Sequence, residues 1–73
     1  MDAVHMMEAL LFASGDPVPA DRLMQVLELT REQVAECAGA LEREYEKRNA
    51  GICLLRLDDA YQLASHPDCA ELI

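Results

Sequence analysis

The chain has 73 residues and a mass of 8.1 kDa, which allows one small domain with a thin hydrophobic core. Its net charge of −8 repels phosphate backbones and anionic lipid, so a protein partner is favoured over an anionic one. With 52% apolar and 27% charged residues, the composition excludes a disordered polar chain, and no apolar run is long enough to span a membrane.

The first predicted helix covers about residues 2–14. Asp2 is a suitable N-cap residue, and Gly15 stands where a helix end favours glycine. At helical spacing, one face carries Val4, Met7, Leu10, Leu11 and Ser14. The opposite face carries His5, Glu8, Ala9 and Phe12, so the only phenylalanine projects from the polar side. Phe12 either contacts another element of the same domain or belongs to a subunit contact.

Two further helices are predicted after an extended connector at residues 16–19, where Pro17 and Pro19 disfavour helix and Val18 leaves room for a short strand. The second helix covers about residues 20–27. The third begins at Thr30, because residues 30–33 fit the capping-box pattern, and it ends near residue 48 or 49. One face of the third helix carries Val34, Cys37, Ala38, Leu41 and Tyr45. Glu44 and Arg48 have the spacing of an i,i+4 ion pair.

A β-hairpin is predicted from strands at residues 52–57 and 61–65, joined by a turn at residues 58–60. This turn does not fix the register, and a shift of one residue would exchange the two faces. In either register the first strand is apolar on both faces, with Ile52 and Leu54 on one and Cys53, Leu55 and Leu57 on the other. We therefore expect one face of the hairpin to be covered by another element or another chain.

A fourth helix is predicted to open at residues 66–68, with Pro67 in its first turn. The sequence reaches Ile73 after about two helical turns, which suggests a fragment of a longer protein. The whole order of elements, three helices followed by a hairpin, is that of a winged helix, in the α+β class and mainly helical.

The sequence does not favour the DNA-binding use of this fold, although a winged-helix transcription regulator remains the alternative function. A DNA-reading third helix needs Arg or Lys toward phosphates, and the wing usually contacts the backbone. The first half of this third helix carries Arg31 against Glu32 and Glu36, and the wing turn carries Asp58 and Asp59. No basic face results, and we expect no direct nucleic-acid binding by this segment.

Catalytic and metal sites are not predicted, and neither is a cofactor, a membrane contact or a small-molecule substrate. The three cysteines, Cys37, Cys53 and Cys69, form no C-x-x-C motif and are interpreted as reduced residues of a cytoplasmic protein. His5 and Glu8 lie one helical turn apart, but such pairs are ordinary on exposed helix faces. There is no glycine-rich phosphate loop and no nucleophile motif.

Several segments resemble one known family in the expected order. Residues 8–18, EALLFASGDPV, closely resemble the opening segment of ScpB, the segregation and condensation protein B family. The likeness continues through residues 41–48, 51–52, 61–64 and 66–70 and so covers nearly the whole chain. The chain departs from the family at residues 58–60, where small residues are usual, and at Cys69, where an aromatic residue is common.

This resemblance implies a non-catalytic subunit of the bacterial SMC–ScpA–ScpB condensin complex, which condenses and segregates chromosomes. Such proteins have two tandem winged-helix domains, dimerise through the first, and hold the kleisin ScpA, which bridges the SMC ATPase heads. Residues 1–73 would be the N-terminal domain, acting mainly in homodimerisation in the cytoplasm and reaching the nucleoid through the complex. The kleisin contact is attributed mainly to the second domain.

The candidate interface combines the polar-side residues of the first helix with two residues of the wing. It contains His5, Ala9, Phe12, Cys53 and Leu55, predicted as one patch. The expected partners are a second copy of the chain, a ScpA-like kleisin and, through it, SMC.

Overall fold

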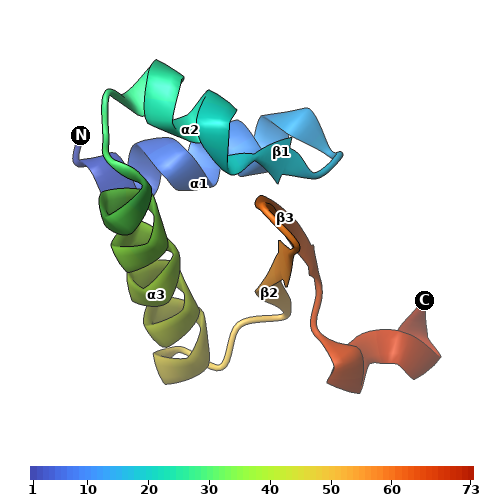
Figure 1. Ribbon diagram of the computed structural model, residues 1–73. Coiled ribbons are helices and arrows are strands. Elements are labelled where there is room, and N and C mark those ends of the chain that lie inside the picture. Colours follow the sequence, from blue (N-terminus) through green and yellow to red (C-terminus); the bar gives the residue numbers. More distant parts are fainter.

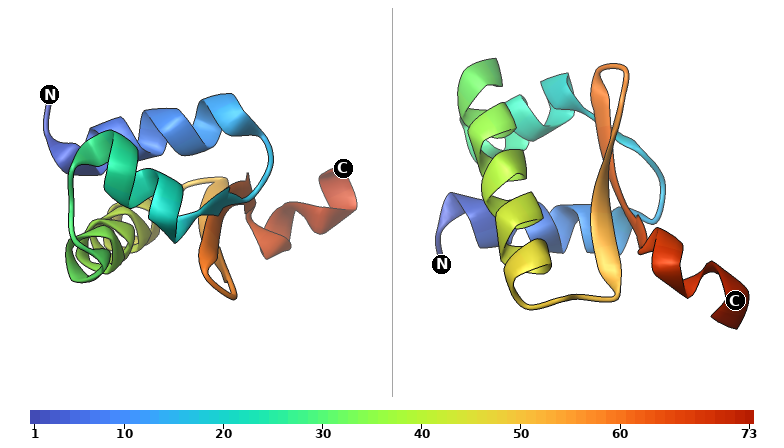
Figure 2. Two further views of the ribbon diagram at one scale, coloured as in Figure 1. Left: turned by 45° about the horizontal axis from the view of Figure 1, so that its top comes forward. Right: turned by 90° about the horizontal axis from the view of Figure 1, so that it is seen from below.

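The structure, a computed structural model, describes residues 1–73 as three α-helices, a three-stranded antiparallel sheet and a short 3₁₀-helix (Figure 1). The elements are α1 (Ala3–Ser14), β1 (Val18–Pro19), α2 (Ala20–Leu27), α3 (Arg31–Lys47), β2 (Ile52–Leu57), β3 (Ala60–Ser65) and η1 (Pro67–Leu72). This order confirms the predicted winged helix. α1 and α2 lie side by side, α3 crosses both, and the β2–β3 hairpin stands beside α3 as the wing (Figure 1, Figure 2).

The helix ends lie where the capping residues predict them. The Asp2 side chain accepts a hydrogen bond of 2.9 Å from the backbone N–H of His5 at the start of α1. At α3 both halves of the capping box are present: the Gln33 N–H donates to the Thr30 hydroxyl at 3.1 Å, and the Thr30 N–H donates to the Gln33 side chain at 2.9 Å. These bonds satisfy N–H groups that the helices themselves leave without a partner.

Gly15 ends α1 in the left-handed region, with φ at 72°, and its N–H donates to the Leu11 carbonyl. We expect Gly15→Ala to lower the free energy of unfolding by about 1–2 kcal/mol, because a Cβ disfavours this conformation. Urea denaturation followed by circular dichroism measures the loss. Gly51→Ala is the matched control, since a Cβ would meet no atom within 4 Å at either glycine but Gly51 has no positive φ. Equal losses in the two variants would contradict the conformational explanation.

The core consists of 12 buried residues, all apolar or aromatic, where the three helices meet the sheet. Its members are Met7, Leu11, Val18, Ala20, Leu23, Val34, Cys37, Ala38, Leu41, Tyr45, Leu54 and Tyr61. All five residues predicted for the inner face of α3 are among them, so the helical periodicity of that segment is confirmed. Tyr45 is buried in this core, and its hydroxyl donates a hydrogen bond of 2.6 Å to the Glu8 carboxylate on α1.

The hairpin register places Leu54 opposite Leu63 and Leu55 opposite Gln62. Leu57 pairs with Ala60 across a two-residue turn, so Ala60 belongs to β3 and the predicted three-residue turn was one residue too long. The shorter turn forms because Asp58 adopts a positive φ of 52°, which aspartate tolerates better than most residues. Side chains alternate along a strand, so Ile52 and Leu54 face the helices while Cys53 and Leu55 face outward.

The tip of the hairpin is attached to the helical part of the molecule. The Ala20 N–H, at the start of α2, donates to the Asp59 carbonyl at 2.8 Å. The Arg31 guanidinium, at the start of α3, contacts the carboxylates of both Asp59 and Asp21. β1 extends the sheet by pairing with β3, with Val18 opposite Tyr61. The predicted short strand at Val18 is therefore confirmed.

The predicted fourth helix is a 3₁₀-helix, η1, in place of an α-helix, although its start at Pro67 is confirmed. None of its residues is buried, so η1 gains no stability from tertiary packing. Without such packing a short segment rarely keeps the regular geometry of an α-helix. His66 caps it by accepting the Asp68 N–H at 3.1 Å. None of the helices combines the length and the apolar character that crossing a membrane requires.

Candidate protein-interaction surface

The most exposed aromatic side chain of the molecule is Phe12, which is 80% exposed on the outer side of α1. It lines a hollow of about 390 Å³ between α1 and the hairpin. The lining residues are Met1, His5, Glu8, Ala9, Phe12, Ile52 and Leu63. A second hollow of about 290 Å³ continues past Phe12 and shares Ile52 and Leu63 with the first. We call His5, Ala9, Phe12, Ile52 and Leu63 the Phe12 surface.

The structure brings together three of the five residues predicted for the interface, His5, Ala9 and Phe12. Cys53 and Leu55 lie on the other face of the hairpin, where Leu55 is 37% exposed. The wing residues that adjoin Phe12 are instead Ile52 and Leu63, which are not among the five predicted residues. Side-chain alternation along β2 puts Ile52 and Leu55 on opposite faces of the hairpin. The sequence does not show which of these residues points toward α1, because that depends on the strand register.

His5 joins the N-terminus of α1 to α3 at the border of this surface. Its Nδ1 lies 2.8 Å from Asp2 Oδ1, and its Nε2 lies 3.1 Å from Glu44 Oε1. Carboxylates only accept hydrogen bonds, so both contacts are satisfied when the ring carries both protons. The hydrogen bond to Glu44, with the charge of Asp2, raises the pKa of His5 above its ordinary value.

These contacts change one expectation from the sequence. Glu44 pairs with His5 and not with Arg48, whose guanidinium lies over the Tyr45 ring at 5.3 Å from the ring centroid. Glu8 accepts a hydrogen bond from the Tyr45 hydroxyl, which joins the middle of α1 to α3. The side chain of His5 thus has a structural role between two elements.

We expect the contribution of His5 to stability to decrease as the pH rises. A raised pKa means that the folded chain holds the proton more tightly than the unfolded chain does. The contribution is therefore complete below about pH 6.5, the ordinary histidine value, and is lost as the pH rises through the higher folded pKa. Unfolding free energies of the wild type and His5→Gln should converge above that range. An NMR titration of the Glu44→Gln variant should show a lower His5 pKa, and an unchanged value would contradict the assignment to Glu44.

The positions that would contact DNA in a winged helix carry compensated or negative charge. Arg31 at the start of α3 is already paired with Asp21 and Asp59. Arg56 on β2 is paired with Glu42 at 3.0 Å. The wing turn presents Asp58 and Asp59, both exposed. This arrangement gives no support to the alternative of a DNA-binding regulator.

Metal-ligating residue types are dispersed over the molecule. The three cysteines are free, with Cys37 buried and Cys53 and Cys69 half-buried. No three His, Cys, Asp or Glu side chains lie together in a group that would hold a metal ion. The Phe12 surface combines an 80% exposed aromatic side chain with an adjoining hollow, features typical of protein-interaction sites.

Comparison with known proteins agrees with this description. The family described as segregation and condensation complex subunit ScpB matches residues 5–73. Segregation and condensation protein B of Syntrophotalea carbinolica is 36% identical over 76 residues, which cover 100% of this chain and 39% of the relative. The dimer of a ScpB N-terminal domain complexed with a ScpA peptide superposes with a TM-score of 0.86 and 28% identity, covering 96% of this chain and 88% of that one.

A longer solved protein, ScpB from Mycobacterium tuberculosis, superposes with a TM-score of 0.85 and 27% identity over 99% of this chain but only 47% of that one. The chain likewise spans between 31% and 41% of the length of the curated relatives that it matches. The family match and the superpositions nevertheless extend over almost every residue described here. The chain therefore belongs to the ScpB family of segregation and condensation complex subunits.

Proposed function

We propose that this chain is a homodimerisation domain and that two copies associate through the Phe12 surface. The observation that carries the proposal is the 80% exposure of Phe12 beside an apolar hollow formed with Ile52 and Leu63. Exposed aromatic residues of this kind are the usual anchors of protein interfaces. The related N-terminal domain of known structure is described as a dimer, which supports the same behaviour here.

In this proposal residues 1–73 correspond to the N-terminal winged-helix domain of a two-domain protein. The support is the coverage of the superpositions, which is 88% of the isolated ScpB N-terminal domain and 47% of the longer ScpB. Cys53 and Leu55, on the outward face of the hairpin, would then lie outside the main dimer contact. They remain available to another part of the protein or to a partner.

The role that follows is that of a non-catalytic subunit of a condensin complex in chromosome segregation. The partner of the related domain is a ScpA peptide, and a ScpA-like kleisin is accordingly the proposed partner of the whole protein, with SMC reached through it. The protein would act in the cytoplasm and reach the nucleoid through this complex. The charge of −8 agrees with contacts to proteins and not to the DNA itself.

Sedimentation analysis of the 73-residue chain across a concentration series tests the proposal directly. We expect a reversible equilibrium between a monomer of 8.1 kDa and a species of twice that mass. Circular dichroism at each concentration provides the control that both species are folded. A folded monomer at every concentration would contradict dimerisation by this domain and would leave the Phe12 surface to a different partner.

A further inference from the structure

The free edge of the sheet is formed by β2, because the strand order is β1-β3-β2. The His66 N–H donates to the Gly51 carbonyl at 2.7 Å, so these two residues form a hydrogen-bonded pair. This pair determines which residues of β2 direct their backbone groups toward β3. In an antiparallel pair alternate residues bond to the partner strand, so Cys53 and Leu55 point their backbone groups at β3. The backbone N–H and C=O groups of Ile52, Leu54 and Arg56 point away from it, and no other backbone or side-chain group bonds to them.

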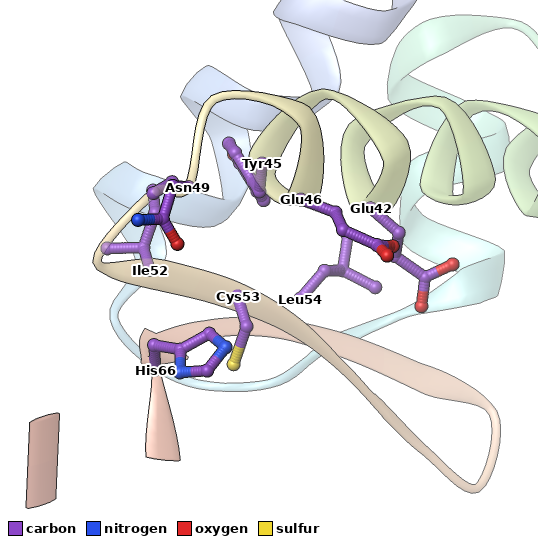
Figure 3. A pocket seen from close by; sticks show the side chains of 9 residues that line it. Glu42, Tyr45, Glu46, Asn49, Ile52, Cys53, Leu54 and His66 are labelled. Carbon is purple, nitrogen blue, oxygen red and sulfur yellow. The ribbon is translucent and has the colours of Figure 1, made fainter. Parts of the chain in front are cut away.

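A hollow of about 390 Å³ lies beside this edge, between β2 and the second half of α3. Figure 3 shows side chains of α3 on one side of it and side chains of β2 on the other. The lining residues are Glu42, Tyr45, Glu46, Asn49, Ala50, Ile52, Cys53, Leu54 and His66. We call this hollow and the adjoining edge of β2 the edge groove.

The shape and chemistry of the edge groove define what fits into it. Unpaired backbone groups are satisfied best by another backbone in extended conformation. Because α3 bounds the hollow on the side opposite β2, an extended segment fits it better than a folded domain does. Glu46 is exposed and has no ion-pair partner, while Glu42 is already held by Arg56. A cation on the incoming segment is therefore favoured.

We propose that the edge groove binds an extended, basic segment of another protein by strand addition to β2. The segment pairs its backbone with Ile52 and Leu54, and one of its lysine or arginine side chains reaches Glu46. This contact is separate from self-association, since Phe12 does not line the edge groove. Ile52 lines both regions, so the test uses a variant in which the Phe12 surface is disabled.

The experiment is an NMR titration of the ¹⁵N-labelled Phe12→Asp chain with a six-residue peptide of alternating lysine and valine. We expect the amide resonances of Ile52, Leu54 and Arg56 to shift and their hydrogen exchange to slow, while the amides of Cys53 and Leu55, already bonded to β3, change less. A peptide of alternating glutamate and valine should bind at least about tenfold more weakly, because like charges meet at Glu46. The Glu46→Lys variant should reverse this preference.

A lysine–valine peptide N-methylated at alternate residues separates strand addition from side-chain contact. It keeps the charge and the apolar side chains but loses the donors of one edge, so binding should be lost. Equal binding of the methylated peptide would overturn the proposal, as would unchanged Ile52 and Leu54 amides at millimolar peptide. Shifts of these amides on dilution of the chain alone would also overturn it, because a second copy would then occupy the edge. Sedimentation of the wild type decides the dimer proposal separately.

Discussion

Phe12→Asp is expected to weaken self-association of this domain by about 2–4 kcal/mol, which is roughly thirtyfold to a thousandfold in the dissociation constant. The side chain is 80% exposed in the single chain, so its replacement removes little from the core. At a dimer interface, however, the same change places a carboxylate against the apolar hollow formed with Ile52 and Leu63. Sedimentation equilibrium of the variant and the wild type at matched concentrations gives the difference.

Leu55→Asp is the matched control for this prediction. It introduces the same charge at an exposed leucine of the hairpin, on the face that points away from α1. We expect the Leu55→Asp chain to remain dimeric at concentrations where Phe12→Asp is monomeric. If Leu55→Asp dissociates and Phe12→Asp does not, the contact lies on the outward face of the wing and the Phe12 surface is not the interface.

Leu41→Ala is expected to have the largest effect on folding, a loss of about 2–5 kcal/mol in the free energy of unfolding. Leu41 has 0% exposure and lies in the middle of the buried face of α3, so its truncation leaves a cavity among the helices. A domain of this length has a total stability of roughly 4–11 kcal/mol, and the variant should therefore approach the unfolding threshold. Urea denaturation followed by far-ultraviolet circular dichroism measures the loss.

The control for Leu41→Ala removes the same atoms from an exposed position. Leu57, at the end of β2, is 40% exposed, and Leu57→Ala should cost no more than about 0.5 kcal/mol. Both variants must be compared at one protein concentration, because dimer formation also stabilises the folded chain. Similar losses in the two variants would show that the helical core is not what limits stability.

The parts of the fold that depend on local sequence could be predicted from it. The faces of α3 follow from a spacing that repeats over 17 residues, and all five residues assigned to the inner face are buried. The caps at Asp2, Gly15 and Thr30 depend on neighbours within three or four residues. These interactions are decided within a few turns of helix, so distant parts of the chain do not alter them.

The candidate site could be predicted only in part, because it depends on contacts between distant segments. His5, Ala9 and Phe12 share one helix face and were found by their periodicity. Ile52 and Leu63 were missed because their orientation depends on a register that the turn sequence leaves open. The pairing of His5 with Glu44 joins residues 39 positions apart, which no local pattern indicates.

The attachment of the hairpin tip has a consequence for the internal motions of the domain. A wing that ends free in solvent can bend and fray independently of its helices. Here the Ala20 amide is held by the Asp59 carbonyl, and Arg31 holds the carboxylate of the same residue. Fraying of the tip therefore also releases the first turn of α2. In hydrogen exchange, the Ala20 amide should consequently open together with the amides of Leu57 and Ala60, as one cooperative unit.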